Sequence, residues 1–326
     1  MNKTNLPPGK TNIAPISQIK NQTVAPQILA RTNAVPVNVF AGRPVQNILE
    51  AQIALARRGI SAGSIDGVIG SQTRAALRAF QQSERLPITG ELDAMTKSKL
   101  VLIAPPYAEL LVTTNDFARL HPLGTNWLSK SQQSRLDYET ILELVAEKSS
   151  CQPNFIRQLN PSINWTNLNL PMTLRIAQVE KPKPQAWAAF IRIRLAEKTL
   201  QAFDARTNLL AHFPCSIAQR IEKRPVGELR VAVIVENPDY TFNPEIFPES
   251  AEARQIKSKL IISPGPNNPV GTVWIGLDKP GYGIHGTPNP EAVGRTESHG
   301  CFRLANWNAE YLLQLVSVGM PIFVEP

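Results

Sequence analysis

Residues 281–303 read GYGIHGTPNPEAVGRTESHGCFR, and this stretch holds the residues around which the chain is organised. It contains His285 and His299, two of the chain's four histidines, and Cys301, one of its three cysteines. A thiol becomes a nucleophile as its thiolate, and a nearby imidazole lowers the pKa of the thiol and carries protons. The glycines of the stretch let a substrate and backbone N–H groups come close to the sulfur. Together these residue types indicate acyl transfer by a cysteine nucleophile.

The spacing within the stretch supports a shared site. His285 ends a predicted short strand, and Cys301 follows sixteen residues later, beyond a turn-rich Thr-Pro-Asn-Pro-Glu segment. We expect that segment to form a loop that folds His285 back over Cys301. His299 precedes Cys301 by two residues, so in an extended segment the two side chains share a face and line one pocket. Residue types alone leave two other interpretations open: a zinc site, because His-x-Cys can chelate a metal, and a set of buried structural residues.

Two paired motifs, residues 285–287 (HGT) and 298–303 (SHGCFR), resemble the active-site motif of the L,D-transpeptidase catalytic domain. That family remodels bacterial peptidoglycan through a cysteine thioacyl-enzyme. Residues 264–271 (PGPNNPVG) resemble a further segment of the same family. The resemblance covers residues 187–326 and favours catalysis over the zinc and structural interpretations.

The resemblance implies a role for each residue of the motif. Cys301 would attack the carbonyl of the third stem-peptide residue, a diamino acid, and release the terminal D-alanine. His285 would hold the thiolate as an ion pair, protonate the leaving amine and then deprotonate the acceptor amine. Its other nitrogen would lie on the carbonyl of Gly286. Backbone N–H groups of His299, Gly300 and Cys301 would form the oxyanion hole.

Two further residues of the motif have supporting roles. Ser298 is expected to shape the loop. Arg303 is expected either to meet a substrate carboxylate or to form a structural salt bridge. The implied mechanism requires no cofactor and no metal.

Composition bounds the other classes of function. The chain has 326 residues, of which 43% are hydrophobic, enough for two or three packed domains. No run of about 18 or more apolar residues is present, so the sequence predicts no transmembrane helix. The net charge is +8, but residues 186–326 carry fourteen basic and fourteen acidic side chains. A nucleic-acid enzyme would concentrate basic charge around its site, so we expect no nucleic-acid partner.

The first hundred residues divide into a tail and a folded unit. Residues 1–44 are rich in proline and show no periodicity, so we interpret them as a disordered tail in which no signal peptide is visible. Residues 45–103 predict three helices and resemble the peptidoglycan-binding domain of bacterial wall enzymes, with a helical bundle that binds no ligand as the alternative. The residues that carry this resemblance are Gly63, Ile65, Asp66, Gly67, Gly70, Thr73, Ala76, Phe80, Gln81, Gly90 and Thr96.

A connector and a small module come next. We expect residues 104–137 to be a connector. Residues 138–179 predict helix, loop, helix and strand, and they are similar to the LysM glycan-binding module. They depart from it in two ways, because no opening strand is evident before Tyr138 and Met172 stands where a glycine is usual. Glycan binding and a spacer role are therefore both open.

Residues 187–326 change to a strand pattern. Residues 191–195 (IRIRL) alternate between apolar and charged side chains, which predicts a strand with one buried face. Several similar segments follow, so we predict a β-rich sandwich or barrel-like catalytic domain in a multidomain α+β chain. His212 and Cys215 lie on one predicted strand, and we interpret both as packing residues.

The sequence therefore predicts a peptidoglycan L,D-transpeptidase that cross-links stem peptides and is periplasmic or cell-wall-associated. Its partners would be stem peptides and glycan, and we expect a monomer. Water in place of the amine would make the protein an L,D-carboxypeptidase, and a protein lysine would make it attach proteins to the wall. A non-catalytic wall-binding protein is the alternative from a different class.

Overall fold

The structure is a computed structural model that describes residues 40–181, 183–184, 186–246, 250–295 and 300–326. The folded chain begins with three helices that a small ribbon closes. In that ribbon, β1 (Arg43–Pro44) pairs antiparallel with β2 (Val101–Leu102). The helices are α1 (Ile48–Ala56), α2 (Ser71–Ser83) and α3 (Ala94–Lys99). The side chain of Asn47 caps α1 and that of Asp93 caps α3, as expected for residues that accept from backbone N–H groups at a helix start.

A two-stranded ribbon and two helices follow. β3 (Tyr107–Val112) and β4 (Met172–Ala177) pair antiparallel, with α6 (Ile141–Lys148) and α7 (Pro153–Leu159) between them in the chain. The short helices α4 (Thr114–Ala118) and α5 (Trp127–Ser131) separate β3 from α6. The sequence analysis did not predict β3, because its pairing partner lies some sixty residues further along the chain. Apolar side chains of this region and of the first three helices form one continuous core.

The C-terminal part is built on one curled sheet of eight strands, in the order β13-β12-β11-β8-β14-β5-β6-β7. β12 pairs parallel with β13 and β14 pairs parallel with β5, while the other neighbours are antiparallel. The strands are β5 (Phe190–Arg194), β6 (Thr199–Phe203), β7 (Leu209–Pro214), β8 (Gly227–Glu236), β11 (Val273–Leu277), β12 (Gly283–His285), β13 (Phe302–Arg303) and β14 (Pro321–Glu325).

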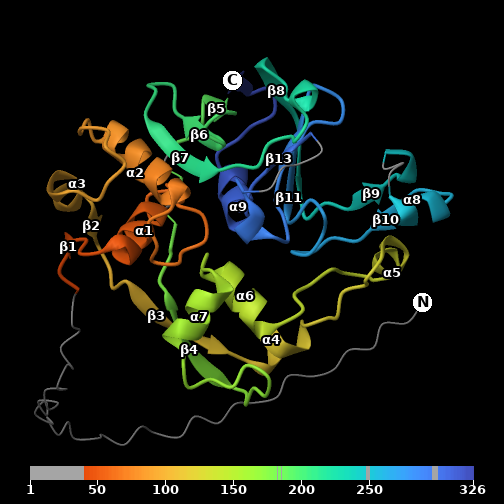
Figure 1. Ribbon diagram of the computed structural model, residues 1–326, viewed down its shortest axis with the longest axis horizontal. Coiled ribbons are helices and arrows are strands. Elements are labelled where there is room, and N and C mark those ends of the chain that lie inside the picture. The colour runs from red at the N-terminus through yellow and green to blue at the C-terminus, as the bar shows by residue number, and fades with distance from the viewer. Residues whose placement is uncertain (1–39, 182, 185, 247–249, 296–299) are drawn as a thin grey trace, which may run out of the picture. The chain divides into compact units, whose positions relative to one another are not determined.

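The concave side of this sheet encloses α9 (Asn306–Leu313), which lies between the β5–β7 end and the β11–β13 end (Figure 1). Buried side chains of α9 join those of the strands in a second core. The predicted α+β class is confirmed, and the predicted sandwich or barrel takes the form of a single curled sheet. Strand β5 alternates between buried and half-buried residues, as its sequence predicts.

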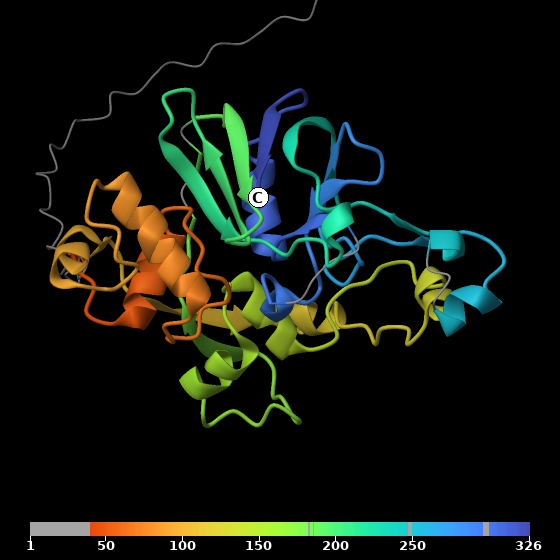
Figure 2. The same ribbon diagram turned by 45° about the horizontal axis from the view of Figure 1, so that its top comes forward.

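A small lobe extends from the sheet (Figure 2). Its strands β9 (Tyr240–Phe242) and β10 (Leu260–Ile262) pair antiparallel, and α8 (Ala251–Gln255) lies between them in the chain. The ring of Trp127, from α5, stacks on Phe242 with 4.3 Å between centroids. The lobe is therefore anchored to a segment that precedes it by more than a hundred residues.

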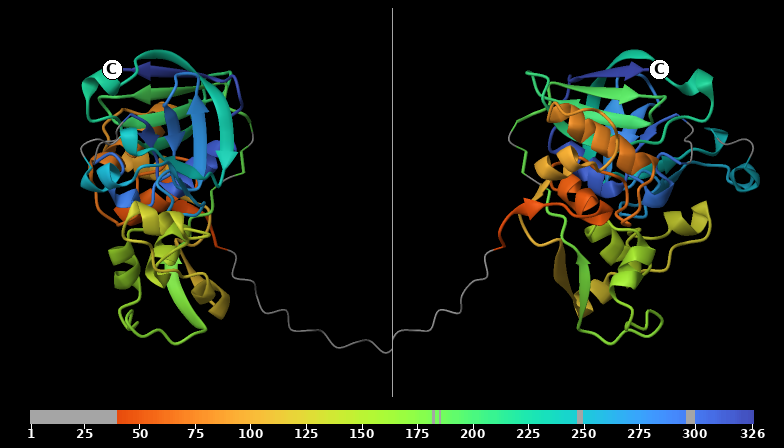
Figure 3. Two further views of the ribbon diagram at one scale, coloured as in Figure 1. Left: turned by 90° about the vertical axis from the view of Figure 1, so that its right-hand side faces the viewer. Right: turned by 60° about the vertical axis from the view of Figure 1, so that its left-hand side comes forward.

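The first helices are bonded directly to the other end of the sheet. The backbone of β7 is hydrogen-bonded to the segment after α1. Ser61 N donates to His212 O at 2.8 Å, and His212 N donates to Gly59 O at 3.0 Å. Helix α2 lies against β7 (Figure 3). Cys151 and Cys215 are both buried free thiols. In the part of the chain that the structure describes, no helix is both long and apolar enough to cross a membrane.

Candidate active site

Strands β12 and β13 bring His285 and Cys301 to one face of the sheet. The strands run parallel, with His285 opposite Arg303. Cys301 immediately precedes β13, and the backbone of Gly283 on β12 is hydrogen-bonded to its thiol. Opposed residues of a parallel pair, and residues two apart on one strand, point to the same face of a sheet. Continued by one residue from β13, this register puts His285 and Cys301 on one face at diagonal positions, and their joint role in a site stays a prediction.

His285 is held in one tautomer by its own backbone turn. Its side chain is buried, and Nδ1 lies 2.6 Å from the carbonyl oxygen of Gly286. A carbonyl accepts, so Nδ1 carries the proton and Nε2 of the neutral ring is left with a lone pair. The pKa of His285 is lowered to about 4, chiefly by burial, while the Gly286 carbonyl opposes this shift and the charge of Arg303 adds to it. At neutral pH the imidazole is uncharged and can accept a proton at Nε2.

The ring of Trp274 covers this histidine. Its centroid lies 5.7 Å from that of His285, with 26° between the planes. A Cβ atom at Gly283 would lie 2.6 Å from the Trp274 ring, so the strand beside Cys301 needs glycine at this position. Trp274 thus fixes the plane of the His285 imidazole, and its ring also packs directly on the backbone of Gly283.

Cys301 is half-buried, and its Sγ lies 3.5 Å from the carbonyl oxygen of Gly281. Burial raises the pKa of this thiol, while the backbone of Gly283 and the charge of Arg303 lower it. Burial thus shifts both pKa values in the direction that favours the neutral thiol and the neutral imidazole. The ion pair that the sequence analysis expected stays a prediction.

Arg303 is fixed beside the thiol. Its backbone exchanges two hydrogen bonds with Ser216, at 2.9 and 3.0 Å. Burial lowers the pKa of its guanidinium, and Cys215 and Cys301 raise it. The guanidinium thus acts electrostatically on Cys301, and it would stabilise a thiolate there.

The remaining residues of the predicted site are placed as follows. Gly286 is buried and Gly300 is half-buried. Ser298 and His299 lie outside the described residues, so their predicted roles stay predictions. Tyr240 of β9 borders the site, since burial and then the nearby Cys301 raise the pKa of its hydroxyl.

Sequence reasoning missed Asn306, which supports the turn after His285. Its side chain is fully buried, and its Nδ2 donates to Glu147 Oε1 at 3.0 Å and to Pro266 O at 3.1 Å. A Cβ atom at Gly286 would lie 2.2 Å from Asn306 Oδ1. Asn306 therefore packs closely against Gly286, whose carbonyl binds His285 Nδ1, and its Oδ1 accepts from Thr272 N. Its position three residues after the predicted motif was the available signal.

Helix α6 contributes two acidic side chains, Glu143 and Glu147, that accept hydrogen bonds from asparagines near the site. Asn267 Nδ2 donates to Glu143 Oε1 at 2.6 Å, and Asn306 binds Glu147. Burial raises the pKa of both carboxyls, that of Glu147 to about 8. Helix α6 is thus hydrogen-bonded directly to the loops that carry the site.

Comparison with known proteins identifies two domains of the chain. Residues 188–324 match the L,D-transpeptidase catalytic domain of the YkuD family, and residues 44–100 match a putative peptidoglycan binding domain. The chain therefore contains an L,D-transpeptidase catalytic domain preceded by a peptidoglycan-binding domain. The LysM-like module stays a prediction.

Relatives cover this catalytic region to different extents. The chain is 25% identical over 185 residues to the putative L,D-transpeptidase YkuD of Bacillus licheniformis, covering 57% of this chain and 93% of the relative. It is 36% identical over 105 residues to the putative L,D-transpeptidase YqjB of Bacillus subtilis, covering 31% of this chain and 51% of the relative. Among solved structures, L,D-transpeptidase 3 from Mycobacterium tuberculosis matches with a TM-score of 0.33 and 16% identity, over 48% of this chain and 66% of that chain.

Proposed function

We propose that this chain is a peptidoglycan L,D-transpeptidase in which Cys301 is the nucleophile and His285 the general base. Two observations support the proposal: the strand that ends in His285 pairs with the strand that directly follows Cys301, and Nδ1 of the histidine lies on Gly286 O, which leaves Nε2 as a base. The match of residues 188–324 to the L,D-transpeptidase catalytic domain supports the same chemistry.

The first half-reaction forms a thioester. The Cys301 thiol gives its proton to Nε2 of His285, and the sulfur attacks the carbonyl carbon of the third stem residue. The resulting imidazolium then gives that proton to the nitrogen of the departing D-alanine, and the carbon–nitrogen bond breaks. The lowered pKa of His285 supports this second transfer, because burial destabilises the imidazolium and favours loss of its proton.

The negative charge that develops on the carbonyl oxygen in the transition state must be stabilised by hydrogen-bond donors. We assign this role to the backbone N–H groups of His299, Gly300 and Cys301, with Ser298 shaping the loop. One such donor is worth about 2.7–4 kcal/mol of barrier in comparable acyl-transfer sites. Arg303 supports the sulfur while it carries negative charge.

The second half-reaction resolves the thioester. An acceptor amine of another stem peptide loses a proton to His285 and attacks the acyl carbon, and the thiol leaves with a proton. Water in place of the amine would give an L,D-carboxypeptidase, and a protein lysine would give attachment of that protein to the wall. The surrounding loops select the acceptor, so the product decides between these outcomes.

The peptidoglycan-binding domain supports peptidoglycan as the partner. Cell-wall-acting domains imply a wall-associated location outside the cytoplasm, and we propose a periplasmic or cell-wall-associated monomer that binds stem peptides and glycan.

Product analysis tests the proposed function. Purified protein is incubated with a disaccharide-tetrapeptide, and the products are separated by liquid chromatography. A cross-linked dimer with release of D-alanine is the expected result, and a tripeptide would indicate the carboxypeptidase. No conversion by folded protein would contradict both and would favour the wall-binding alternative.

A further inference from the structure

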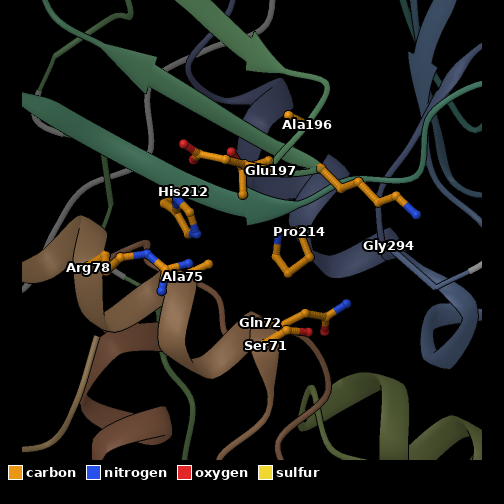
Figure 4. A pocket seen from close by; sticks show the side chains of 11 residues that line it. Ser71, Gln72, Ala75, Arg78, Ala196, Glu197, His212, Pro214 and Gly294 are labelled. Carbon is orange, nitrogen blue, oxygen red and sulfur yellow. The ribbon is translucent and has the colours of Figure 1, made fainter. Parts of the chain in front are cut away.

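A cavity of about 400 Å³ lies between helix α2 and the β6–β7 end of the sheet (Figure 4). One face of α2 lines it with Ser71, Gln72, Ala75 and Arg78, which follow helical spacing. From the sheet side, His212 of β7 points toward Arg78. The cavity is distinct from the face that carries Cys301.

Two buried polar groups line this cavity without using their hydrogen-bonding capacity. His212 is 2% exposed and Thr199 is 3% exposed. Within the described part of the chain, His212 Nε2 and Thr199 Oγ1 have no hydrogen-bond partner. Buried polar atoms in folded proteins are nearly always paired, so such a pair at a cavity wall indicates a site for a polar ligand.

The hydrogen bond at Nδ1 of His212 determines whether Nε2 can donate or accept a hydrogen bond in the cavity. Gln201 Nε2 lies 3.2 Å from His212 Nδ1, and the amide nitrogen is the donor, so Nδ1 accepts. Burial, together with Arg78 and Arg194, lowers the pKa of His212 to about 3, so the ring is neutral at physiological pH. The proton then lies on Nε2, which presents an N–H donor to the cavity.

The other charges and dipoles at the cavity favour an anion. Arg78 and Lys198 contribute two cations to the lining. The carboxylate of Glu197, which also lines the cavity, is paired with Arg194 at 3.4 Å. The N-cap of the thirteen-residue helix α2 is Gly70, so no side chain caps the helix. Its first N–H groups, beside Ser71 and Gln72, therefore favour negative charge as well.

We propose that this cavity is a second ligand site, which binds the carboxylate of a small organic anion through Arg78, the Nε2–H of His212 and the hydroxyl of Thr199. A carboxylate supplies acceptor oxygens for all of these donors and a charge for the guanidinium. Gly294 also lines the cavity, and Gln72 Nε2 donates to Val293 O at 2.6 Å, so the site adjoins the loop that leads to Cys301.

The carboxylate could belong to a sugar acid of the wall or to a small free acid, and a titration separates these sources. The full-length protein is titrated with N-acetylmuramic acid, with acetate, and with N-acetylglucosamine, which is the corresponding sugar without a carboxylate. The readout is the ring 15N–1H NMR signal of His212, assigned by its loss in His212→Gln. This signal reports on the cavity independently of turnover at Cys301.

Two variants of α2 control the experiment. Arg78→Gln removes an exposed cation that lines the cavity, and we expect it to weaken carboxylate binding about tenfold or more, the loss typical of one charge-assisted hydrogen bond. Arg74→Gln removes the same charge from the same helix, where it pairs with Glu91 away from the cavity lining, and should bind like the parent protein.

The outcomes are distinct. Tighter binding of N-acetylmuramic acid than of acetate would identify a wall-derived ligand, and equal binding would identify a free acid. The proposal is overturned if no carboxylate shifts the His212 signal, if N-acetylglucosamine shifts it equally, or if Arg78→Gln binds as tightly as Arg74→Gln does.

Discussion

The two ends of the curled sheet carry similar residues with opposite chemistry. At one end His285 lies near Cys301 and Arg303, and at the other His212 lies on the strand that leads to Cys215. Both histidines are buried, and burial lowers the pKa of both rings. The contrast between these two ends shows what makes a histidine and a cysteine into a catalytic pair.

The partner of Nδ1 makes the first difference. In His285 this nitrogen donates to the Gly286 carbonyl, which leaves Nε2 as a base. In His212 it accepts from Gln201, which leaves Nε2 as a donor. Exposure makes the second difference, because Cys301 is half-buried whereas Cys215 is fully buried and burial raises its thiol pKa far above the ordinary value. Tautomer and access, more than residue type, separate the two ends.

Replacing each of the two cysteines in turn should give the largest difference in activity between the two ends. Cys301→Ala should lower D-alanine release by about 10⁴-fold or more, because a catalytic group that acts as a unit with its base leaves little activity when it is removed. Cys215→Ala should leave kcat unchanged, since that sulfur is fully buried and a substrate cannot reach it. Steady-state release of D-alanine measures both, and equal loss in the two variants would refute the assignment.

The histidines give the next largest expected effect. His285→Gln should lower kcat by about 10²–10⁴-fold, the usual contribution of a general base. His212→Gln should retain kcat, although it changes a buried residue and therefore lowers the melting temperature. A matched loss of kcat in His212→Gln, at a temperature where the variant is folded, would show that the two ends are not separate.

A smaller effect is expected at the support of the catalytic turn. Asn306→Ala removes the donor to the Pro266 carbonyl and one of the donors to Glu147, at about 1–3 kcal/mol of unfolding free energy for such a loss, and should also lower kcat. Asn308, on the same helix, binds Ser61 Oγ at 3.1 Å, away from the turn. Asn308→Ala should therefore lose stability while keeping kcat. Chemical denaturation and rates on both variants measure the difference.

The pH dependence of stability gives the smallest effect and should be alike at the two ends. Burial lowers the pKa from 6.5 to about 4 in His285 and to about 3 in His212. Between pH 6.5 and 4 the unfolded chain binds more protons, so stability is lost as the pH falls, by up to about 1.4 kcal/mol per unit for each histidine. Replacing either histidine with glutamine should flatten this slope equally.

Glu147 contributes to the pH dependence of stability with the opposite sign. This contribution cancels when the parent is compared with the histidine variants, because all of them contain Glu147. Its pKa is raised from 4.5 to about 8, so its contribution to stability is lost as the pH rises through that window. Denaturant titrations of the parent and the two histidine variants across pH 4.5–6.5 cancel this common contribution. Unequal slopes would show that one of the two rings is charged in the folded protein.

The local part of the site was predictable from the sequence. His285, Gly286 and Cys301 lie within seventeen residues of one another, and the sequence analysis expected the intervening loop to fold His285 back over Cys301. The contact of His285 Nδ1 with the Gly286 carbonyl involves adjacent residues, and the resemblance to the L,D-transpeptidase family implied it. Sequence neighbours and period-two alternation carried these predictions.

The long-range part was not predictable. Asn306 and Glu147 are 159 residues apart, and no local pattern pairs them. Strand β3 depends on β4 for its pairing, and the sequence analysis treated its residues as a connector. His212 was interpreted as a packing residue, and it is indeed buried, but the cavity beside it exists only because α2 lies against β7. Whether strands close into one curled sheet or two layers is likewise set by contacts between distant segments.

The most direct test of the catalytic assignment is intact-protein mass spectrometry after mixing with a disaccharide-tetrapeptide. The account predicts a covalent adduct on Cys301 with the mass of the donor less its terminal D-alanine, present in the parent and in Cys215→Ala and absent in Cys301→Ala. An adduct that persists in Cys301→Ala, or no adduct and no turnover with folded parent protein, would contradict it.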